Sequence, residues 1–123
     1  MVKRRCNFTI LVIDVPVDLY ILRHGDAEPL GLESQDDAER SLTSEGLEIM
    51  TREGQGMHRL GITLDVLFSS PNKRARQTAQ IVHEELSLVS PITFSDSIAT
   101  GSWEELLVEV DAVITHSNQQ YLD

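Results

Sequence analysis

An apolar, β-prone stretch from Val17 to Leu22 is the first clear pattern in the chain. Its length and composition predict a buried strand whose carboxyl end carries Arg23 and His24. Gly25 then permits a turn of the backbone. The next segment, residues 26–42, holds many acids and shows no regular period, so it predicts a surface loop.

Helical spacing begins after Thr43, a residue type that caps helices, and Glu45 follows in the expected first turn. Apolar or small residues then recur every three or four positions, and they are Leu47, Met50, Gly54, Met57 and Leu60. This spacing predicts an amphipathic helix that ends near Gly61.

A second strand, followed directly by a helix, is predicted in the middle of the chain. The segment DVLFSS, residues 65–70, has the composition of a buried strand and ends at Pro71. The following segment, PNKRARQTAQIVHEEL, predicts a helix, since a proline near the start of a helix removes no N–H that the helix needs. The predicted inner face of this helix consists of Ala75, Thr78, Ala79, Val82 and Leu86.

The segment after this helix contains a short strand and another helix start. Residues 91–95 predict a third strand. Ser102 and Glu105 match the Ser-x-x-Glu capping box, and an apolar stripe accompanies it with Trp103, Leu106, Leu107 and Val110. Because strands alternate with helices, the pattern predicts an α/β fold with a largely parallel sheet flanked by helices. The ligand site of such a fold lies at the carboxyl ends of its strands.

Composition and charge limit the class of protein. The 123-residue chain has ten Lys and Arg against twenty Asp and Glu, a formal net charge of -10. Because so negative a chain repels phosphate backbones, nucleic acid is not expected as a partner. The one cysteine, Cys6, cannot form an internal disulfide, which is typical of a reducing compartment such as the cytoplasm.

The N-terminal residues 1–16 are basic and then apolar, as in a secretory signal, but the apolar run from Phe8 to Ile13 is short and Asp14 follows it. No stretch of the sequence approaches the length of a membrane span, so no membrane association is expected. We interpret residues 1–16 as an extra strand or a loose extension, and residues 17–123 as the main domain.

Basic residues are concentrated where the ligand site of this fold is expected. Arg23 and His24 end the first predicted strand, and the second strand with its helix contributes Ser69, Ser70, Lys73, Arg74 and Arg76. Carboxyl ends of parallel strands share one sheet edge, and the amino end of the helix adds its positive dipole there. Arginines and a helix terminus together favour an anion such as phosphate. A neutral histidine beside them can attack phosphorus and form a phosphohistidine that water hydrolyses.

Three segments, LRHGDAE, ERSLTSEG and SSPNKRARQTAQIV, carry a family resemblance that covers residues 17–107. Together they resemble the histidine phosphatase (phosphoglycerate mutase-like) superfamily, and most closely its short SixA-type phosphohistidine phosphatases. The resemblance implies that His24 is the phosphorylated nucleophile and that Arg23 and Arg74 clamp the phosphoryl group. It also implies a phosphorylated protein of the histidine-containing phosphotransfer type as substrate, in cytoplasmic signal transduction. We expect no metal and no organic cofactor.

The family also has a second histidine, usually in a Gly-His-x-Pro pattern at the end of a later strand. This chain offers His116, in VITHSNQQ, without that glycine and proline. In one interpretation Ala112 to Thr115 is a strand that brings His116 beside His24. In the other, the helix that starts after Ser102 continues, because no Gly or Pro interrupts it before His116. The second interpretation is favoured, with the expectation that the domain is truncated at its C-terminus.

The segment between His24 and Thr43 is too short to form a lid, so the phosphate site is predicted to be open to a protein surface. The imidazole leaving group of a phosphohistidine also needs less help from a general acid than an alkoxide does. Both features favour a phosphohistidine phosphatase. The alternatives are a phosphomonoesterase or mutase that acts on small phosphorylated metabolites, and a non-catalytic phosphoprotein-binding relative.

Overall fold

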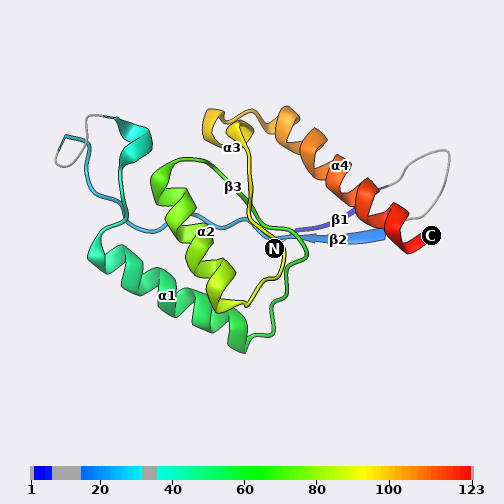
Figure 1. Cartoon of the computed structure of the whole chain (residues 1–123), viewed down its shortest axis with the longest axis horizontal. Helices are drawn as coiled ribbons and strands as arrows, with labels where there is room; N and C mark the ends of the chain where they lie inside the picture. Colours follow the sequence, from blue (N-terminus) through cyan, green and yellow to red (C-terminus); the bar gives the residue numbers. More distant parts are fainter. Residues whose placement is uncertain (1, 7–14, 32–35, 123) are drawn as a thin grey trace.

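The computed structural model of the chain describes residues 2–6, 15–31 and 36–122, and Figure 1 shows their arrangement. Its elements, in chain order, are β1 (Val2–Cys6), β2 (Val15–Leu19), the 3-10 helix η1 (Asp37–Glu39), α1 (Ser44–Arg59), β3 (Phe68–Ser69), α2 (Lys73–Glu85), β4 (Thr93–Phe94), α3 (Asp96–Thr100) and α4 (Trp103–Leu122). Within these ranges no helix is both long and apolar enough to cross a bilayer.

The strands form two separate pairs. β1 and β2 are antiparallel, with Val2 opposite Leu19. β3 and β4 are parallel, with Phe68 opposite Thr93, and α2 supplies the crossover that a parallel pair needs. The predicted α/β class with a parallel sheet is therefore confirmed. The strands predicted over residues 65–70 and 91–95 are present but shorter than predicted, since each is reduced to two residues, and both residues of β4 are exposed.

The first strand differs from the sequence prediction. A buried strand from Val17 to Leu22 is wrong, because the strand occupies Val15–Leu19 and because Ile21 and Leu22 are 71% and 46% exposed. β2 also pairs with β1 and not with β3, so β2 and β3 do not share a sheet edge. An apolar run does not identify its own partner, and a nearby antiparallel strand is reached with less loss of loop entropy than a distant parallel one.

Helix α1 begins and ends where its sequence signals predict. The Thr43 hydroxyl accepts a hydrogen bond from the Gly46 N–H at 2.9 Å, which caps the first turn. The helix ends at Arg59, and Gly61 follows with a φ of 73°, a conformation that glycine adopts without strain. Met50 and Gly54 of the predicted inner face are buried, so the helix itself is confirmed. Leu47 and Leu60, predicted on the same face, are 39% and 80% exposed, so that part of the prediction is wrong.

Helices α1 and α2 pack side by side (Figure 1). Gly54 permits this close approach, because a Cβ on it would lie 2.8 Å from Cγ of Glu85 in α2. The apolar side chains that are buried within the described ranges are Leu42, Met50, Ala79 and Val82. The core therefore lies between α1, α2 and the segment around Leu42, which precedes α1.

A short helix, α3, follows β4 and is not predicted from the sequence. The Ser95 hydroxyl accepts from the Ser97 N–H at 3.2 Å at its start, and Gly101 ends it in the left-handed conformation. The Ser97 hydroxyl donates to the Glu109 carboxylate at 2.9 Å, which joins α3 to α4. Both hydrogen bonds involve buried serines, so this corner of the fold is held by polar contacts.

Helix α4 runs through residues 112–116 without interruption. The helical interpretation of this segment is confirmed, and the alternative of a strand from Ala112 to Thr115 is wrong. The Thr115 hydroxyl donates to the Asp111 carbonyl at 2.8 Å, a bond between residues four apart that helical geometry provides. Trp103 starts the helix with 51% of its surface exposed, so the predicted apolar stripe is only partly covered at its beginning.

Candidate active site

His24 lies in an irregular turn that follows β2. Its side chain is half-buried, and its Nδ1 lies 2.7 Å from the carbonyl oxygen of Gly25. Because a carbonyl oxygen only accepts hydrogen bonds, this contact places the proton of the neutral ring on Nδ1. Nε2 then keeps its lone pair. A histidine nucleophile requires this arrangement, with one nitrogen held by the protein and the other free to attack.

One hydroxyl group joins the backbone next to His24 to helix α2. The Gly25 N–H donates to Thr78 Oγ1 at 3.2 Å, and Thr78 Oγ1 donates to the Arg74 carbonyl at 2.8 Å. Thr78 is only 4% exposed, so little water competes for these bonds. The turn that carries His24 is therefore fixed relative to the first turn of α2, which carries Arg74.

The turn also packs tightly on the start of α1. A Cβ on Gly25 would lie 2.7 Å from Cγ of Met50. The Asp26 carbonyl accepts from the Thr43 N–H at 2.9 Å, and a Cβ on Gly46 would collide with that same carbonyl oxygen. The glycines of the RHG and LTSEG segments therefore allow the turn to reach the core and the helix.

Asp37 holds the side chain of Arg74, which is 14% exposed. Arg74 Nη1 donates to the Asp37 carbonyl oxygen at 2.7 Å, and Arg74 Nη2 donates to Asp37 Oδ2 at 3.1 Å. Arg40 Nη1 donates to the other carboxylate oxygen, Oδ1, at 2.9 Å, and Arg40 Nε donates to the Glu28 carbonyl at 2.7 Å. A single carboxylate of η1 therefore lies between two arginines.

These hydrogen bonds lower the pKa of Asp37 below its ordinary value. The bond from Arg40 has the largest effect and the bond from Arg74 the next, because both stabilise the charged carboxylate. Desolvation acts in the opposite direction and is outweighed. Asp37 is therefore an anion at neutral pH, and it forms a compact group with two cations.

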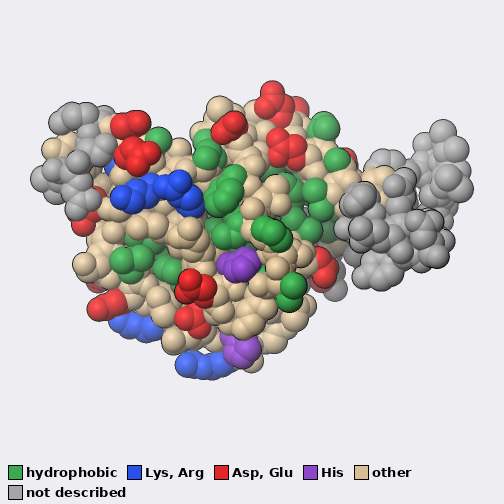
Figure 2. Space-filling view, in the orientation of Figure 1, with side chains coloured by type: hydrophobic (Ala, Val, Ile, Leu, Met, Phe, Trp, Pro, Cys, Tyr) green, Lys and Arg blue, Asp and Glu red, His purple; other side chains and the backbone are tan. Residues whose placement is uncertain are grey.

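The other basic residues that the sequence singles out are less constrained. Arg23 and Arg76 are exposed, and Lys73 is half-exposed at the start of α2. Figure 2 shows basic side chains gathered over the amino end of α2, next to the acidic side chains of η1. The positive charge near Arg74 is thus local, on a chain whose formal net charge is -10.

The two predicted serines shape the turn between β3 and α2. The Ser69 hydroxyl donates to the Ser70 carbonyl at 2.8 Å, and the Ser70 hydroxyl accepts from the Asn72 N–H at 3.2 Å. Both serines are buried. His116, the other candidate, belongs to α4, and its side chain lies outside the described residues.

His24 and Arg74 are linked by a different route from the predicted one. The predicted shared edge of one parallel sheet is wrong, because β2 and β3 belong to different strand pairs. Contacts of α2 make the link instead, through the Thr78 hydroxyl and through Gln77, whose Oε1 accepts from the Leu42 N–H at 2.7 Å. The QT pair of the RARQTA segment therefore connects α2 to the turn and to the entry of α1.

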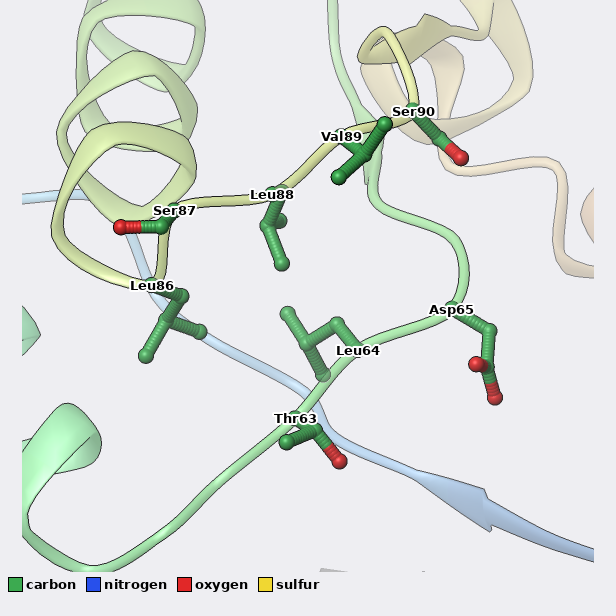
Figure 3. A pocket seen from close by; sticks show the side chains of 8 residues that line it. All are labelled: Thr63, Leu64, Asp65, Leu86, Ser87, Leu88, Val89 and Ser90. Carbon is green, nitrogen blue, oxygen red and sulfur yellow. The ribbon is translucent and has the colours of Figure 1, made fainter.

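Two surface hollows lie away from these residues. One, of about 340 Å³, is lined by residues 63–65 and 86–90, and Leu64 and Leu88 point toward each other across it (Figure 3). It lies at the carboxyl end of α2, about 18 Å along the helix from Arg74. The other lies on α1 and is lined by Leu47, Glu48, Thr51 and Arg52. The first has no basic lining residue, and Glu48 lies 3.8 Å from Arg52 in the second, so neither resembles a phosphate site.

Asp37 and Thr78 are two residues of the site whose contacts are not predicted from the sequence. Thr78 carries a usable signal, because a threonine on the buried face of a helix needs a hydrogen-bond partner. No sequence signal distinguishes Asp37 from the acids around it, because its contact with Arg74 spans 37 positions of sequence.

The chain is similar to several solved structures. The structure of the protein histidine phosphatase SixA complexed with tungstate is 28% identical to this chain, with a TM-score of 0.56, over 62% of this chain and 47% of that one. A protein from Nakamurella multipartitia assigned as phosphohistidine phosphatase SixA is 25% identical, with a TM-score of 0.51, over 62% of this chain and 40% of that one. A third, assigned as SixA from Agrobacterium tumefaciens, has a TM-score of 0.56 over 62% of this chain and 48% of that one, and at 24% identity supports the fold alone.

This chain therefore spans about half the length of the structures that it resembles, and the predicted phosphoglycerate mutase-like fold is confirmed over that part. A search of curated proteins found no match. The family model described as "Histidine phosphatase superfamily (branch 1)" matches residues 19–121. Because this match covers most of the chain, the protein belongs to the histidine phosphatase superfamily.

Proposed function

We propose that this protein is a phosphohistidine phosphatase that removes phosphate from a protein histidine through a covalent intermediate on His24. The observation that carries the proposal is the contact between His24 Nδ1 and the Gly25 carbonyl, which leaves Nε2 available for attack. Arg74 adds a guanidinium group. It lies on the turn of α2 that Thr78 connects to the backbone of Gly25. Arg23, the residue before the nucleophile, is the second proposed clamp.

The proposed first step transfers the phosphoryl group to His24. Nε2 attacks phosphorus while the P–N bond of the substrate breaks. The electron pair of that bond stays on the substrate ring, which leaves as a neutral imidazole because its other nitrogen carries a proton. The phosphorylated ring of His24 then bears a positive charge, and the Gly25 carbonyl holds its Nδ1 proton. Guanidinium groups favour this step because they stabilise negative charge on the equatorial phosphoryl oxygens.

In the second step, water attacks phosphorus and the P–Nε2 bond breaks. Inorganic phosphate leaves with the oxygen of that water, one proton passes to the solvent, and His24 returns to its neutral form. An imidazole leaves more readily than an alkoxide, so neither step depends on a strong general acid.

We also propose a protein partner, of the histidine-containing phosphotransfer type, in cytoplasmic signal transduction. The exposure of Arg23 supports a macromolecular substrate, because the clamp is reachable from the surface. The likeness to a protein histidine phosphatase that binds tungstate, a tetrahedral oxyanion, supports a phosphate-sized anion at the site.

A non-catalytic phosphoprotein binder is the second candidate. It is favoured by the helical backbone of residues 112–116, since the resemblance implied a second catalytic histidine at the end of a strand. Such a protein keeps the anion clamp and does not turn over.

Incubation of the full chain with a phosphorylated histidine protein tests the proposal. We expect an acid-labile phosphoenzyme and release of inorganic phosphate, both abolished by His24→Ala and both kept by His58→Ala, which removes an exposed histidine of α1. If His24→Ala retains more than a few per cent of the release, the nucleophile is another group. Oxyanion binding without release of phosphate identifies the non-catalytic binder.

A further inference from the structure

The guanidinium of Arg74 is held by contacts within the chain. It is bonded to two acceptors of one residue, the carbonyl oxygen and the carboxylate of Asp37, at 2.7 and 3.1 Å. An exposed arginine samples many rotamers, and a ligand that binds it must first restrict them. In the folded chain, the contact with Asp37 already restricts the rotamers of Arg74.

We propose that Asp37 is a positioning residue of the anion site, which holds Arg74 in its binding orientation before the phosphoryl group arrives. The inference rests on the proposed function in that it takes Arg74 as the phosphate clamp. Arg74 has five N–H groups and Asp37 engages one on each terminal nitrogen, so three remain for an oxyanion.

The charge of Asp37 does not cancel that of the clamp, because Arg40 shares the carboxylate. Oδ1 accepts from Arg40 at 2.9 Å and Oδ2 accepts from Arg74 at 3.1 Å. Two cations and one anion leave a net charge of +1 on the group. Arg40 is itself fixed by the Glu28 carbonyl, so the carboxylate is held from both sides.

A competing explanation is that Asp37 is a latch that occupies Arg74 until phosphate displaces it. Two observations oppose it. The shorter bond of Arg74 is to the backbone carbonyl of Asp37, so release requires η1 itself to move and not only a side chain to rotate. Asp36 also caps η1, with its Oδ1 accepting from the Ala38 N–H at 3.1 Å, which keeps that backbone in place.

The two explanations predict opposite signs for one measurement, the affinity of the full chain for tungstate by titration calorimetry. If Asp37 is a latch, or acts only through its charge, Asp37→Ala tightens binding, because it removes a negative charge near an anion site. If Asp37 positions Arg74, Asp37→Ala weakens binding roughly three- to tenfold, because only the backbone bond then holds the arginine and the ligand must restrict it further. We expect the weakening.

Glu39→Ala is the matched control, because it removes the same charge from the same 3-10 helix without breaking a bond to Arg74. We expect its affinity to stay within about twofold of the unaltered chain or to rise slightly. Asp37→Asn keeps the size of the side chain and one acceptor, so a smaller loss is expected there. If Asp37→Ala fails to fold, as judged by circular dichroism, the sign of the change in Asp37→Asn decides the question.

A double-mutant cycle separates positioning from a general structural effect. In an Arg74→Ala background, Asp37→Ala should not weaken tungstate binding further, because the group that it positions is gone. A further loss in that background, or unchanged or tighter binding in the single variant, overturns the proposal. Absence of tungstate binding by the unaltered chain overturns both this inference and the proposed function, whereas binding without phosphate release overturns only the catalytic function.

Discussion

The hydroxyl of Thr78 accepts a hydrogen bond from the backbone N–H of Gly25 at 3.2 Å, across 53 positions of sequence. The donor belongs to the residue after the proposed nucleophile. The acceptor lies one helical turn after the proposed clamp, Arg74. This part-buried contact ties the turn that carries the proposed nucleophile to the helix that carries the proposed clamp.

Thr78→Val should lower phosphate release at least tenfold, because valine keeps the shape of the side chain and removes the hydroxyl. It leaves the part-buried Gly25 N–H without its partner, which costs roughly 1 kcal/mol of folding stability. Thr78→Ser keeps the hydroxyl and should retain most of the release. Phosphate release and urea unfolding of both variants check this, and equal release from valine and serine would show that the hydroxyl is not needed.

Two glycines of α1 should respond to alanine in opposite directions. Gly46→Ala places a Cβ against the Asp26 carbonyl, so it should destabilise the chain by roughly 1–3 kcal/mol and displace the turn that holds His24. Gly56, in the same helix, has open space where its Cβ would be. Gly56→Ala should therefore stabilise the chain by up to about 1 kcal/mol. Urea unfolding of the pair measures both, and a Gly46→Ala variant as stable as the parent would contradict the close packing.

Local signals predict the helices well, because a helix is stabilised mainly by residues near one another in sequence. The Thr43 cap and the spacing that buries Met50 both lie within α1. Strand partners are not local. The stretch around Ile21 and Leu22 is apolar, yet it is exposed, and nothing in it identifies the antiparallel partner of β2.

The candidate site also has a part that the sequence predicts and a part that it does not. RHG and RARQTA are contiguous, so the sequence identifies His24 and Arg74 as candidates. The contacts that bring their segments together, Gly25 with Thr78 and Asp37 with Arg74, span 53 and 37 positions and follow only from the fold. The short helix α3 offers one cap and one glycine, too little periodicity for a prediction.

Acid should loosen the contact between Asp37 and Arg74 only at low pH. The folded pKa of Asp37 is lowered, first by Arg40 and then by Arg74, so the carboxylate contributes to folding stability at every pH above its ordinary value of about 3.9. The contribution is lost as pH falls from there through the lowered folded value. Asp37→Asn should therefore be less stable than the parent by a constant amount above about pH 5, and the gap should close toward pH 3. Urea unfolding at several pH values measures this gap, and a gap that persists unchanged at pH 3 would exclude the carboxylate as its source.

Arg74→Ala should weaken tungstate binding about tenfold to a hundredfold, which corresponds to the loss of a charge-assisted contact worth roughly 1.5–3 kcal/mol. Arg76 is the control, because it is exposed and lies two residues along the same helix. Arg76→Ala should change the affinity by no more than the small effect of one distant charge. Equal losses from both variants in a calorimetric titration would indicate a diffuse basic surface instead of a specific clamp.

His116→Ala should change neither phosphate release nor tungstate affinity. The family resemblance gives His116 a catalytic role only if a strand from Ala112 to Thr115 ends beside His24, and these residues are helical. The chemistry does not require it either, since an imidazole leaving group departs without a strong general acid. Release from a phosphorylated histidine protein and calorimetry, each run beside the His58→Ala control, check this. A loss of release in His116→Ala with folding intact would return His116 to the catalytic set.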